Sequence, residues 1–121
     1  MIVEDEPDNR EIIRAVVEDL LGYRAMLVPD GSVAVQTAIE ARPDLVLMDL
    51  MTPVLDGFQA IKQLKSRDET AHIPVVAVTA LSRAIDRQRA LEEGADGYIS
   101  KPFDLDELVA VIRRFVGEGV A

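Results

Sequence analysis

The sequence predicts an α/β fold, a doubly wound sheet of five parallel strands built from five strand–helix units, (βα)5. Two observations support this prediction. Short apolar runs alternate along the chain with segments of helical periodicity. Two of these runs, LVLM (45–48) and VVAV (75–78), are continuously apolar, as expected for strands with helices on both faces. Because strand–helix–strand crossovers are right-handed, such units wind on both sides of one sheet.

The first unit begins with the run MIV, which gives a strand over 1–4 at most. Asp8 and Asn9 follow Pro7, and both are favourable N-cap residues, so we expect the first helix to begin there. Its apolar side chains recur at helical spacing and stop at Gly22, a residue suited to a helix C-terminus. These apolar positions are Ile12, Ile13, Val16, Val17, Leu20 and Leu21.

The second unit has a weaker strand at 24–28 and a helix that opens at Gly31 or Ser32 and ends before Pro43. The third strand is expected at 44–49. A turn, TPVLDG, follows it, and the next helix carries Phe58, Ile61 and Leu64 on one face.

The last two units have strands at 74–79 and 97–100. The helix between them, at 83–93, has few apolar residues, so we expect it to be easy to displace, and Gly94 is its expected C-terminal residue. The last helix has apolar residues at regular helical spacing from Leu105 to Val116.

Length and composition indicate one domain over residues 1–121, with a core at 1–117 and a short C-terminal tail. The absence of cysteine excludes disulfides and thiolate metal sites, and no apolar run is long enough to span a membrane. The acidic N-terminus does not resemble a secretory signal, so we expect a cytoplasmic protein. A net charge of −9 argues against direct nucleic-acid binding and against membrane binding.

Residues able to handle a phosphoryl group or a divalent metal follow four of the strands. They are Glu4 and Asp5, Asp49, Thr79, and Lys101. Because the carboxyl ends of parallel strands share one edge, we expect these side chains to meet there. Three carboxylates at about 4 Å repel one another by roughly 4 kcal/mol per pair at an effective dielectric of about 20. A hard cation with oxygen ligands, such as Mg²⁺, relieves that repulsion.

Each residue also has an ordinary interpretation. Glu4 and Asp5 alone would suit a solvated loop, Thr79 alone would suit any strand, and most lysines are surface residues. The adjacent Pro102 restricts the backbone of Lys101 and favours a defined position for it. The combination favours a site over these separate interpretations.

Four segments in order resemble the receiver domain of two-component response regulators over essentially the whole chain. They are VEDE (3–6), LVLMDLMTPVLDG (45–57), VVAVTA (75–80) and GYISKPF (97–103). The resemblance implies the flavodoxin-like strand order 2-1-3-4-5, whose change of direction lies between the first and third strands.

The resemblance also implies a role for each site residue. Asp49 corresponds to the phosphoacceptor, a carboxylate nucleophile, and Lys101 to the cation that contacts the phosphoryl oxygens. Glu4 and Asp5 correspond to the acidic pair that holds Mg²⁺, or Mn²⁺ in its place, with Asp49 and the main-chain carbonyl of Met51. Thr79 corresponds to the switch hydroxyl, Tyr98 to the aromatic residue that follows it, and the small Ala80 to the residue that gives phosphoryl access.

The family resemblance further implies a sensor histidine kinase or histidine phosphotransfer protein as phosphoryl donor. It also implies a downstream partner or output domain of unknown identity and, as an option, a phosphorylation-dependent homodimer. The protein would then be a signalling phosphoacceptor that catalyses only its own phosphorylation and slow dephosphorylation, either alone or as part of a larger protein.

Three features depart from the family pattern. Thr52 replaces a methionine before the proline, with little expected effect on the metal ligands. Met51 and Leu81 are apolar at positions that tune phosphoryl lifetime in the family, so we expect a long-lived phosphoryl state. The first strand lacks two or three apolar residues that usually precede the acidic pair in the family, which implies either reduced stability or a trimmed chain.

Three alternatives remain. A flavodoxin-like FMN carrier would need phosphate-binding amides after the first strand, where EDEPDN is acidic. An aspartyl-phosphate hydrolase would need a second aspartate at the position of Met51. A degenerate receiver would act as a phosphorylation-independent interaction module, against which the complete set of site residues argues.

Overall fold

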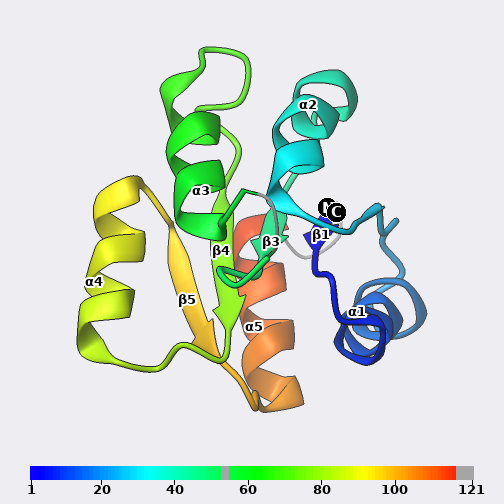
Figure 1. Cartoon of the computed structure of the whole chain (residues 1–121). Coiled ribbons are helices and arrows are strands. Elements are labelled where there is room, and N and C mark those ends of the chain that lie inside the picture. The colour runs from blue at the N-terminus through cyan, green and yellow to red at the C-terminus, as the bar shows by residue number, and fades with distance from the viewer. Residues whose placement is uncertain (53–54, 117–121) are drawn as a thin grey trace.

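The computed structural model describes residues 1–52 and 55–116 of the chain, so the expected C-terminal tail lies outside the described residues. Five parallel strands form one sheet in the order β2-β1-β3-β4-β5 (Figure 1). The predicted doubly wound fold and its strand order are therefore confirmed. The strands are β1 (Ile2–Val3), β2 (Leu27–Val28), β3 (Val46–Met48), β4 (Val75–Thr79) and β5 (Gly97–Ser100).

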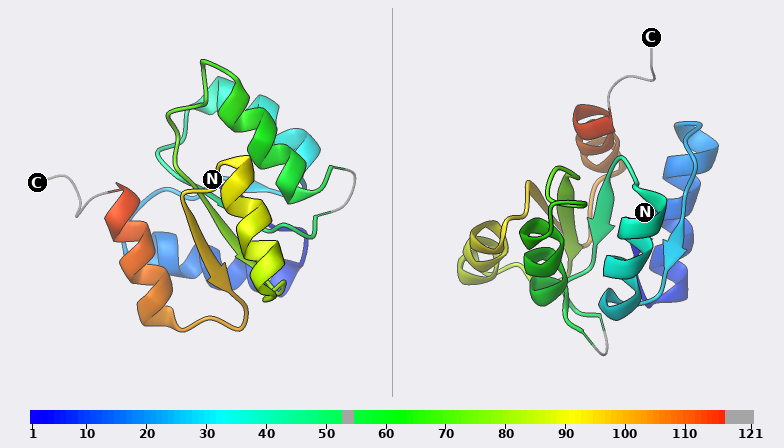
Figure 2. Two further views of the ribbon diagram at one scale, coloured as in Figure 1. Left: turned by 90° about the vertical axis from the view of Figure 1, so that its left-hand side faces the viewer. Right: turned by 90° about the horizontal axis from the view of Figure 1, so that it is seen from above.

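Helices cover both faces of this sheet (Figure 2). One buried cluster joins the sheet to the first and last helices, and a second joins it to the three helices between them. The helices are α1 (Pro7–Arg14) with its π-helical continuation η1 (Ala15–Leu20), α2 (Gly31–Ala41), α3 (Gly57–Ser66), α4 (Ala84–Glu93) and α5 (Leu105–Val116).

The strands supply both clusters because successive side chains point to opposite faces. Ile2 and Leu47 pack with α1, η1 and α5, whereas Val3 and Met48 pack with α2 and α3. All residues of β3 and β4 are buried, as their continuous apolar runs predicted.

Parallel register brings the carboxyl ends of the strands level with one another. Val3 lies opposite Met48 in β3, and Met48 lies opposite Ala77 in β4. The residues after β1 and β3 therefore emerge at the same edge, which places Glu4 beside Asp49, and β4 ends with Thr79 at that edge.

The first helix begins earlier than predicted. Its N-cap is Glu6, whose carboxylate accepts hydrogen bonds from the backbone N–H groups of Asp8 (3.2 Å) and Asn9 (2.8 Å). The prediction of Asp8 or Asn9 as N-cap was therefore wrong. The physical reason is Pro7, which lacks an N–H and suits the first helical position, so the cap falls on the residue before it.

Strand β2 is shorter than the predicted 24–28. The backbone N–H of Ala25 donates to the carboxylate of Glu18 (3.1 Å) in η1 and not to a neighbouring strand. Regular pairing with β1 therefore begins only at Leu27. The preceding helix ends as predicted at Gly22, which has a φ of 76°.

Helix α4 agrees with its predicted range and ends at Gly94, which has a φ of 114°. That left-handed conformation favours glycine and closes the helix. Within the described ranges 1–52 and 55–116, we find no helix with the length and apolar character needed to cross a membrane.

Candidate functional site

The three predicted carboxylates meet at the carboxyl edge of the sheet. One oxygen from each of Glu4, Asp5 and Asp49 lies within 4.8 Å of the other two. Glu4 is 1% exposed and Asp49 7% exposed, whereas Asp5 is exposed to solvent. The cluster therefore has two carboxylates anchored in the protein and one at the entrance.

Lys101 links the two buried carboxylates. Its Nζ donates to Asp49 Oδ2 at 3.0 Å and to Glu4 Oε1. Its backbone N–H donates to the carbonyl of Thr79 (2.7 Å), which holds the start of the β5–α5 connection against the end of β4. The ammonium is thus placed opposite the acids by both its side chain and its main chain.

The pKa values of this pair shift for different reasons. Burial raises the pKa of Glu4, and the hydrogen bond from Lys101 offsets part of that shift. Burial alone would lower the pKa of Lys101, but its hydrogen bonds to Glu4 and Asp49 outweigh burial and raise it. Lys101 is therefore a cation at neutral pH, available to a negatively charged group that enters the site.

Main-chain contacts orient Asp49. Its Oδ1 accepts a hydrogen bond from the N–H of Met51 (2.9 Å), which leaves Oδ2 with Lys101. Gly57 lies so close to this segment that a Cβ there would be 2.6 Å from the Asp49 carbonyl oxygen. Only glycine fits at position 57. The sequence analysis placed Gly57 in a turn and did not predict this close packing.

The predicted switch residues, Thr79 and Tyr98, both form hydrogen bonds with the connection between β4 and α4. The buried hydroxyl of Thr79 accepts a hydrogen bond from the N–H of Leu81 (3.3 Å), and the Tyr98 hydroxyl donates to the carbonyl of Leu81. Thr79 and Tyr98 therefore bind the main-chain N–H and the main-chain carbonyl of the same residue, Leu81. Ala80, which directly follows Thr79, is small and exposed to solvent.

Two further residues at this edge make contacts that the sequence analysis did not predict. Arg10 donates from Nη1 to the carbonyl of Glu4 (3.3 Å), and the hydroxyl of Thr52 donates to the carbonyl of Leu55 (3.0 Å). Arg10 lies one helical turn after the N-cap Glu6. With the start of the helix known, the sequence would place the Arg10 side chain on the helix face near Glu4. Nothing in the sequence predicts the Thr52 contact.

A family model described as the response regulator receiver domain matches residues 1–113. That match covers most of the chain. The chain belongs to this family. The identification made from the four sequence segments is confirmed, and the protein is a signalling receiver domain and not an enzyme of the ordinary turnover type.

This receiver domain is similar to curated and structurally characterised relatives. It is 39% identical over 118 residues to the polar-differentiation response regulator DivK of Brucella anthropi, covering 98% of this chain and 95% of that protein. It shares 39% identity and a TM-score of 0.88 with the receiver domain of the sensor histidine kinase PA1611 from Pseudomonas aeruginosa, covering 96% and 94%. That crystal structure has a magnesium ion coordinated in its active-site cleft.

A receiver domain of a signal-transduction histidine kinase from Syntrophus aciditrophicus is also similar. It is 34% identical, with a TM-score of 0.88, over 98% of this chain and 89% of that chain. The relatives thus include both a response regulator and domains of sensor kinases, and the receiver fold is common to both.

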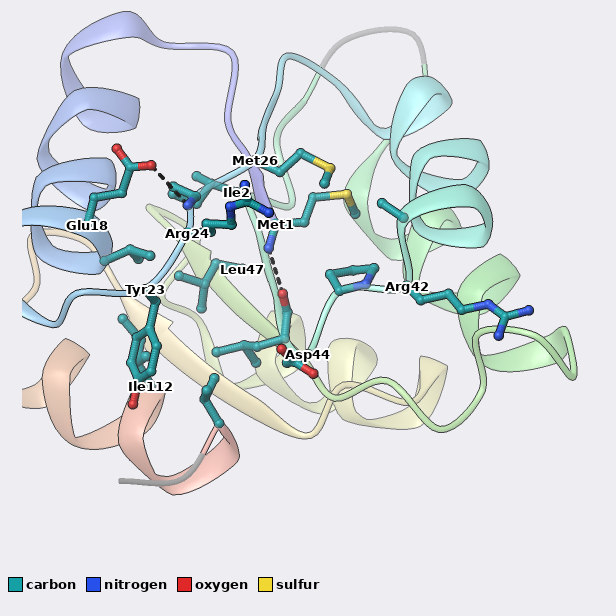
Figure 3. Close-up of a pocket in the computed structure, with 16 residues that line it drawn as sticks. Met1, Ile2, Glu18, Tyr23, Arg24, Met26, Arg42, Asp44, Leu47 and Ile112 are labelled. Carbon is teal, nitrogen blue, oxygen red and sulfur yellow. Dashed lines mark hydrogen bonds between the residues drawn. The ribbon is translucent and has the colours of Figure 1, made fainter. Parts of the chain in front are cut away.

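A separate pocket of about 680 Å³ lies at the opposite end of the sheet, near the amino ends of β1 and β3 (Figure 3). Its floor includes Ile2 and Leu47, and Arg24, Arg42 and Asp44 lie around it. The acids that cluster at the carboxyl edge do not line it. The pocket and the cluster of acids are therefore two separate features of the domain.

Proposed function

We propose that this receiver domain accepts a phosphoryl group on Asp49 in a Mg²⁺-dependent reaction and passes the change to its α4–β5–α5 surface. The observation that carries the proposal is that the carboxylates of Glu4 and Asp5 lie beside the carboxylate of Asp49, and that the Lys101 ammonium contacts Asp49 Oδ2. Family membership supports the same function.

The residues present fit a magnesium ion. Mg²⁺ prefers oxygen ligands and usually binds through one or two carboxylates, with water and phosphate oxygens completing its coordination. Glu4, Asp5 and Asp49 would hold it together with the main-chain carbonyl of Met51, and Mn²⁺ would be accepted by the same oxygens. When bound, the ion neutralises charge on the phosphoryl oxygens.

Phosphoryl transfer then follows from the position of Asp49. One carboxylate oxygen attacks phosphorus in line, forming an acyl phosphate bond while the phosphorus–nitrogen bond of a donor phosphohistidine breaks and the imidazole leaves. Lys101 already contacts Oδ2 of Asp49 at 3.0 Å, so its ammonium is placed to stabilise the phosphoryl oxygens. Exposed Ala80 leaves the approach open.

The switch step uses contacts on Leu81. A phosphoryl group on Asp49 offers the Thr79 hydroxyl a charged acceptor, and rotation of Oγ1 toward it moves this oxygen away from the Leu81 N–H that donates to it. Loss of the bond from the Leu81 N–H to Thr79 loosens the β4–α4 connection. The bond from the Tyr98 hydroxyl to the Leu81 carbonyl then breaks, and Tyr98 turns inward. The few apolar contacts of α4 make it the element that moves.

The partners follow from this chemistry. A sensor histidine kinase or a histidine phosphotransfer protein supplies the phosphoryl group, and a downstream partner or a second copy of the domain binds the altered surface. The acidic net charge disfavours direct binding to nucleic acid, and the absence of cysteine suits the cytoplasm.

Mass spectrometry after incubation with acetyl phosphate and Mg²⁺ tests the proposal. We expect an adduct with the mass of one phosphoryl group, absent from Asp49→Asn and from samples with EDTA. A folded wild-type protein with no adduct would contradict phosphoacceptor function and would favour the phosphorylation-independent interaction module.

The phosphoryl lifetime gives a second test. Met51 is 57% exposed and Leu81 half-buried, and apolar groups at both positions disfavour an ordered attacking water. We expect the acyl phosphate to last minutes or longer after donor removal, and to decay faster in Met51→Asn than in the matched Met51→Leu. Decay of the wild type within seconds would contradict this expectation.

A further inference from the structure

The segment after Asp49 is held by hydrogen bonds on both sides of Met51. On the amino side, the Met51 N–H donates to Asp49 Oδ1 at 2.9 Å. On the carboxyl side, the hydroxyl of Thr52 donates to the carbonyl of Leu55 at 3.0 Å. The Met51 side chain itself is largely exposed, so these two bonds and not side-chain packing fix its main chain.

Thr52 is a buried polar residue, with 6% of its surface exposed. Its amide nitrogen and the carbonyl of Met51 belong to one planar peptide unit, so any rotation of that carbonyl must also move Thr52. A buried hydroxyl that lost its acceptor would pay a desolvation cost, which opposes such a movement. A hydrogen bond that holds Thr52 in place therefore also restrains the Met51 carbonyl.

A second element holds the acceptor of this hydrogen bond. Gly31, the first residue of α2, packs so closely against Leu55 that a Cβ on it would lie 2.5 Å from the Leu55 carbonyl oxygen. The oxygen that Thr52 contacts is therefore fixed from the side of α2 as well. Thr52 is anchored to the body of the domain and not only to its own loop.

We propose that Thr52 is a positioning residue for divalent-metal binding, because its hydroxyl fixes the peptide unit that carries the Met51 carbonyl ligand. The inference rests on the proposed function, since it takes that carbonyl as a ligand of Mg²⁺. Thr52 itself contributes no ligand atom. Its effect is preorganisation, in that a carbonyl already held in place loses less conformational freedom when the ion binds.

Thr52→Val tests the role of the hydroxyl because valine has nearly the same shape. The affinity for Mg²⁺ is measured on the whole chain by isothermal titration calorimetry, and stability is measured by urea unfolding in EDTA. We expect the Kd for Mg²⁺ to rise by roughly 2- to 12-fold, the range that the net value of one neutral hydrogen bond gives. Thr52→Ser, which keeps the hydroxyl, should bind Mg²⁺ nearly as the wild type does.

Thr70→Val is the matched control. Thr70 is fully buried and its hydroxyl donates to the carbonyl of Leu64 (2.6 Å), before β4 begins and far from the acids. We expect this variant to lose stability without a change in the Kd for Mg²⁺. Gly31→Ala, which displaces the Leu55 carbonyl from the other side, should weaken Mg²⁺ binding as Thr52→Val does.

The outcomes separate the two proposals. If the wild type binds Mg²⁺ and both Thr52→Val and Gly31→Ala bind it equally well, Thr52 has only a structural role and the inference is overturned. If the wild type does not bind Mg²⁺, the proposed function itself is wrong, and the inference falls with it. Weaker binding in Thr52→Val with an unchanged Kd in Thr70→Val supports the inference.

Discussion

Two buried carboxylates share one ammonium at the carboxyl edge of the sheet. Lys101 contacts both Glu4 and Asp49, and the side chains of the three residues are 12%, 2% and 9% exposed. Removal of the cation from such a group leaves buried negative charge without compensation, which costs more than the ion pair contributes by itself. Lys101 therefore supports the folded state as well as the proposed phosphoryl chemistry.

We expect Lys101→Met to lower the free energy of unfolding in EDTA by about 3 kcal/mol, since the loss of one partner of a buried pair costs about that amount. Urea unfolding measures the change, with Lys62→Met on the exposed face of α3 as control. Addition of Glu4→Gln to Lys101→Met should recover part of the loss. Equal stability of Lys101→Met and Lys62→Met would contradict the expectation.

The residues that carry charge in this site were predictable from the sequence, but those that shape its backbone were not. Glu4, Asp49 and Lys101 each follow an apolar run, and parallel strands bring such positions to one edge. The contact of Thr52 with Leu55 depends on the path of a loop that no periodicity describes. The tight packing of Gly57 on Asp49 likewise depends on the position of the first residue of α3 relative to the end of β3.

In the helices, too, apolar periodicity predicted where a helix lies but not its detailed geometry. The apolar stripe predicted one helix up to Gly22, yet its second half, η1, is a π-helix. Arg14 donates to Glu11, Glu18 and Asp19, and the pair with Asp19 is five residues apart, a spacing that the wider π-helical turn brings together. Apolar periodicity does not distinguish the two helix types over so few residues.

The connection from β4 to α4 is the element whose movement the switch requires. Binding of beryllofluoride with Mg²⁺, which mimics the phosphoryl group, should release the Tyr98 hydroxyl from the Leu81 carbonyl and bury the ring. In a Tyr23→Phe background Tyr98 is the only tyrosine and the chain has no tryptophan, so its fluorescence quenching by acrylamide reports its exposure. Unchanged quenching on beryllofluoride binding would contradict the switch.

The start of α4 is stabilised by an ion pair that depends on pH. The hydrogen bond from Arg83 lowers the pKa of Asp86 below its ordinary value of 3.8, so the folded state binds this proton less readily than the unfolded state. The stabilisation is therefore complete above pH 3.8 and is lost as the pH falls through the lower, folded value.

We expect Asp86→Asn to destabilise the domain near neutral pH and to differ less from the wild type in acid. Urea unfolding across this range measures the difference. In an Arg83→Gln background the same substitution should lose this pH dependence. A penalty for Asp86→Asn that stays constant from neutral to acid pH would show that the ion pair is not its cause.

Across the whole domain, the strand order places a concentrated group of acids on a protein that is already strongly negative. Strands β1 and β3 are neighbours in the sheet although most of two strand–helix units separate them in sequence, and this brings Glu4 and Asp5 to Asp49. With a net charge of −9, any salt should stabilise the fold by screening its self-repulsion. A bound divalent ion should add a stabilisation that screening does not supply.

We therefore expect MgCl₂ to raise the free energy of unfolding more than NaCl at the same ionic strength. An ion that binds only the folded state contributes about 2.7 kcal/mol at 100 times its Kd. Asp5→Asn is the informative variant, because Asp5 is exposed and its loss leaves the core and the Lys101 contacts intact. Its stability should respond to MgCl₂ and NaCl alike. An equal response of the wild type to the two salts would show that the acids at the sheet edge do not form a metal site.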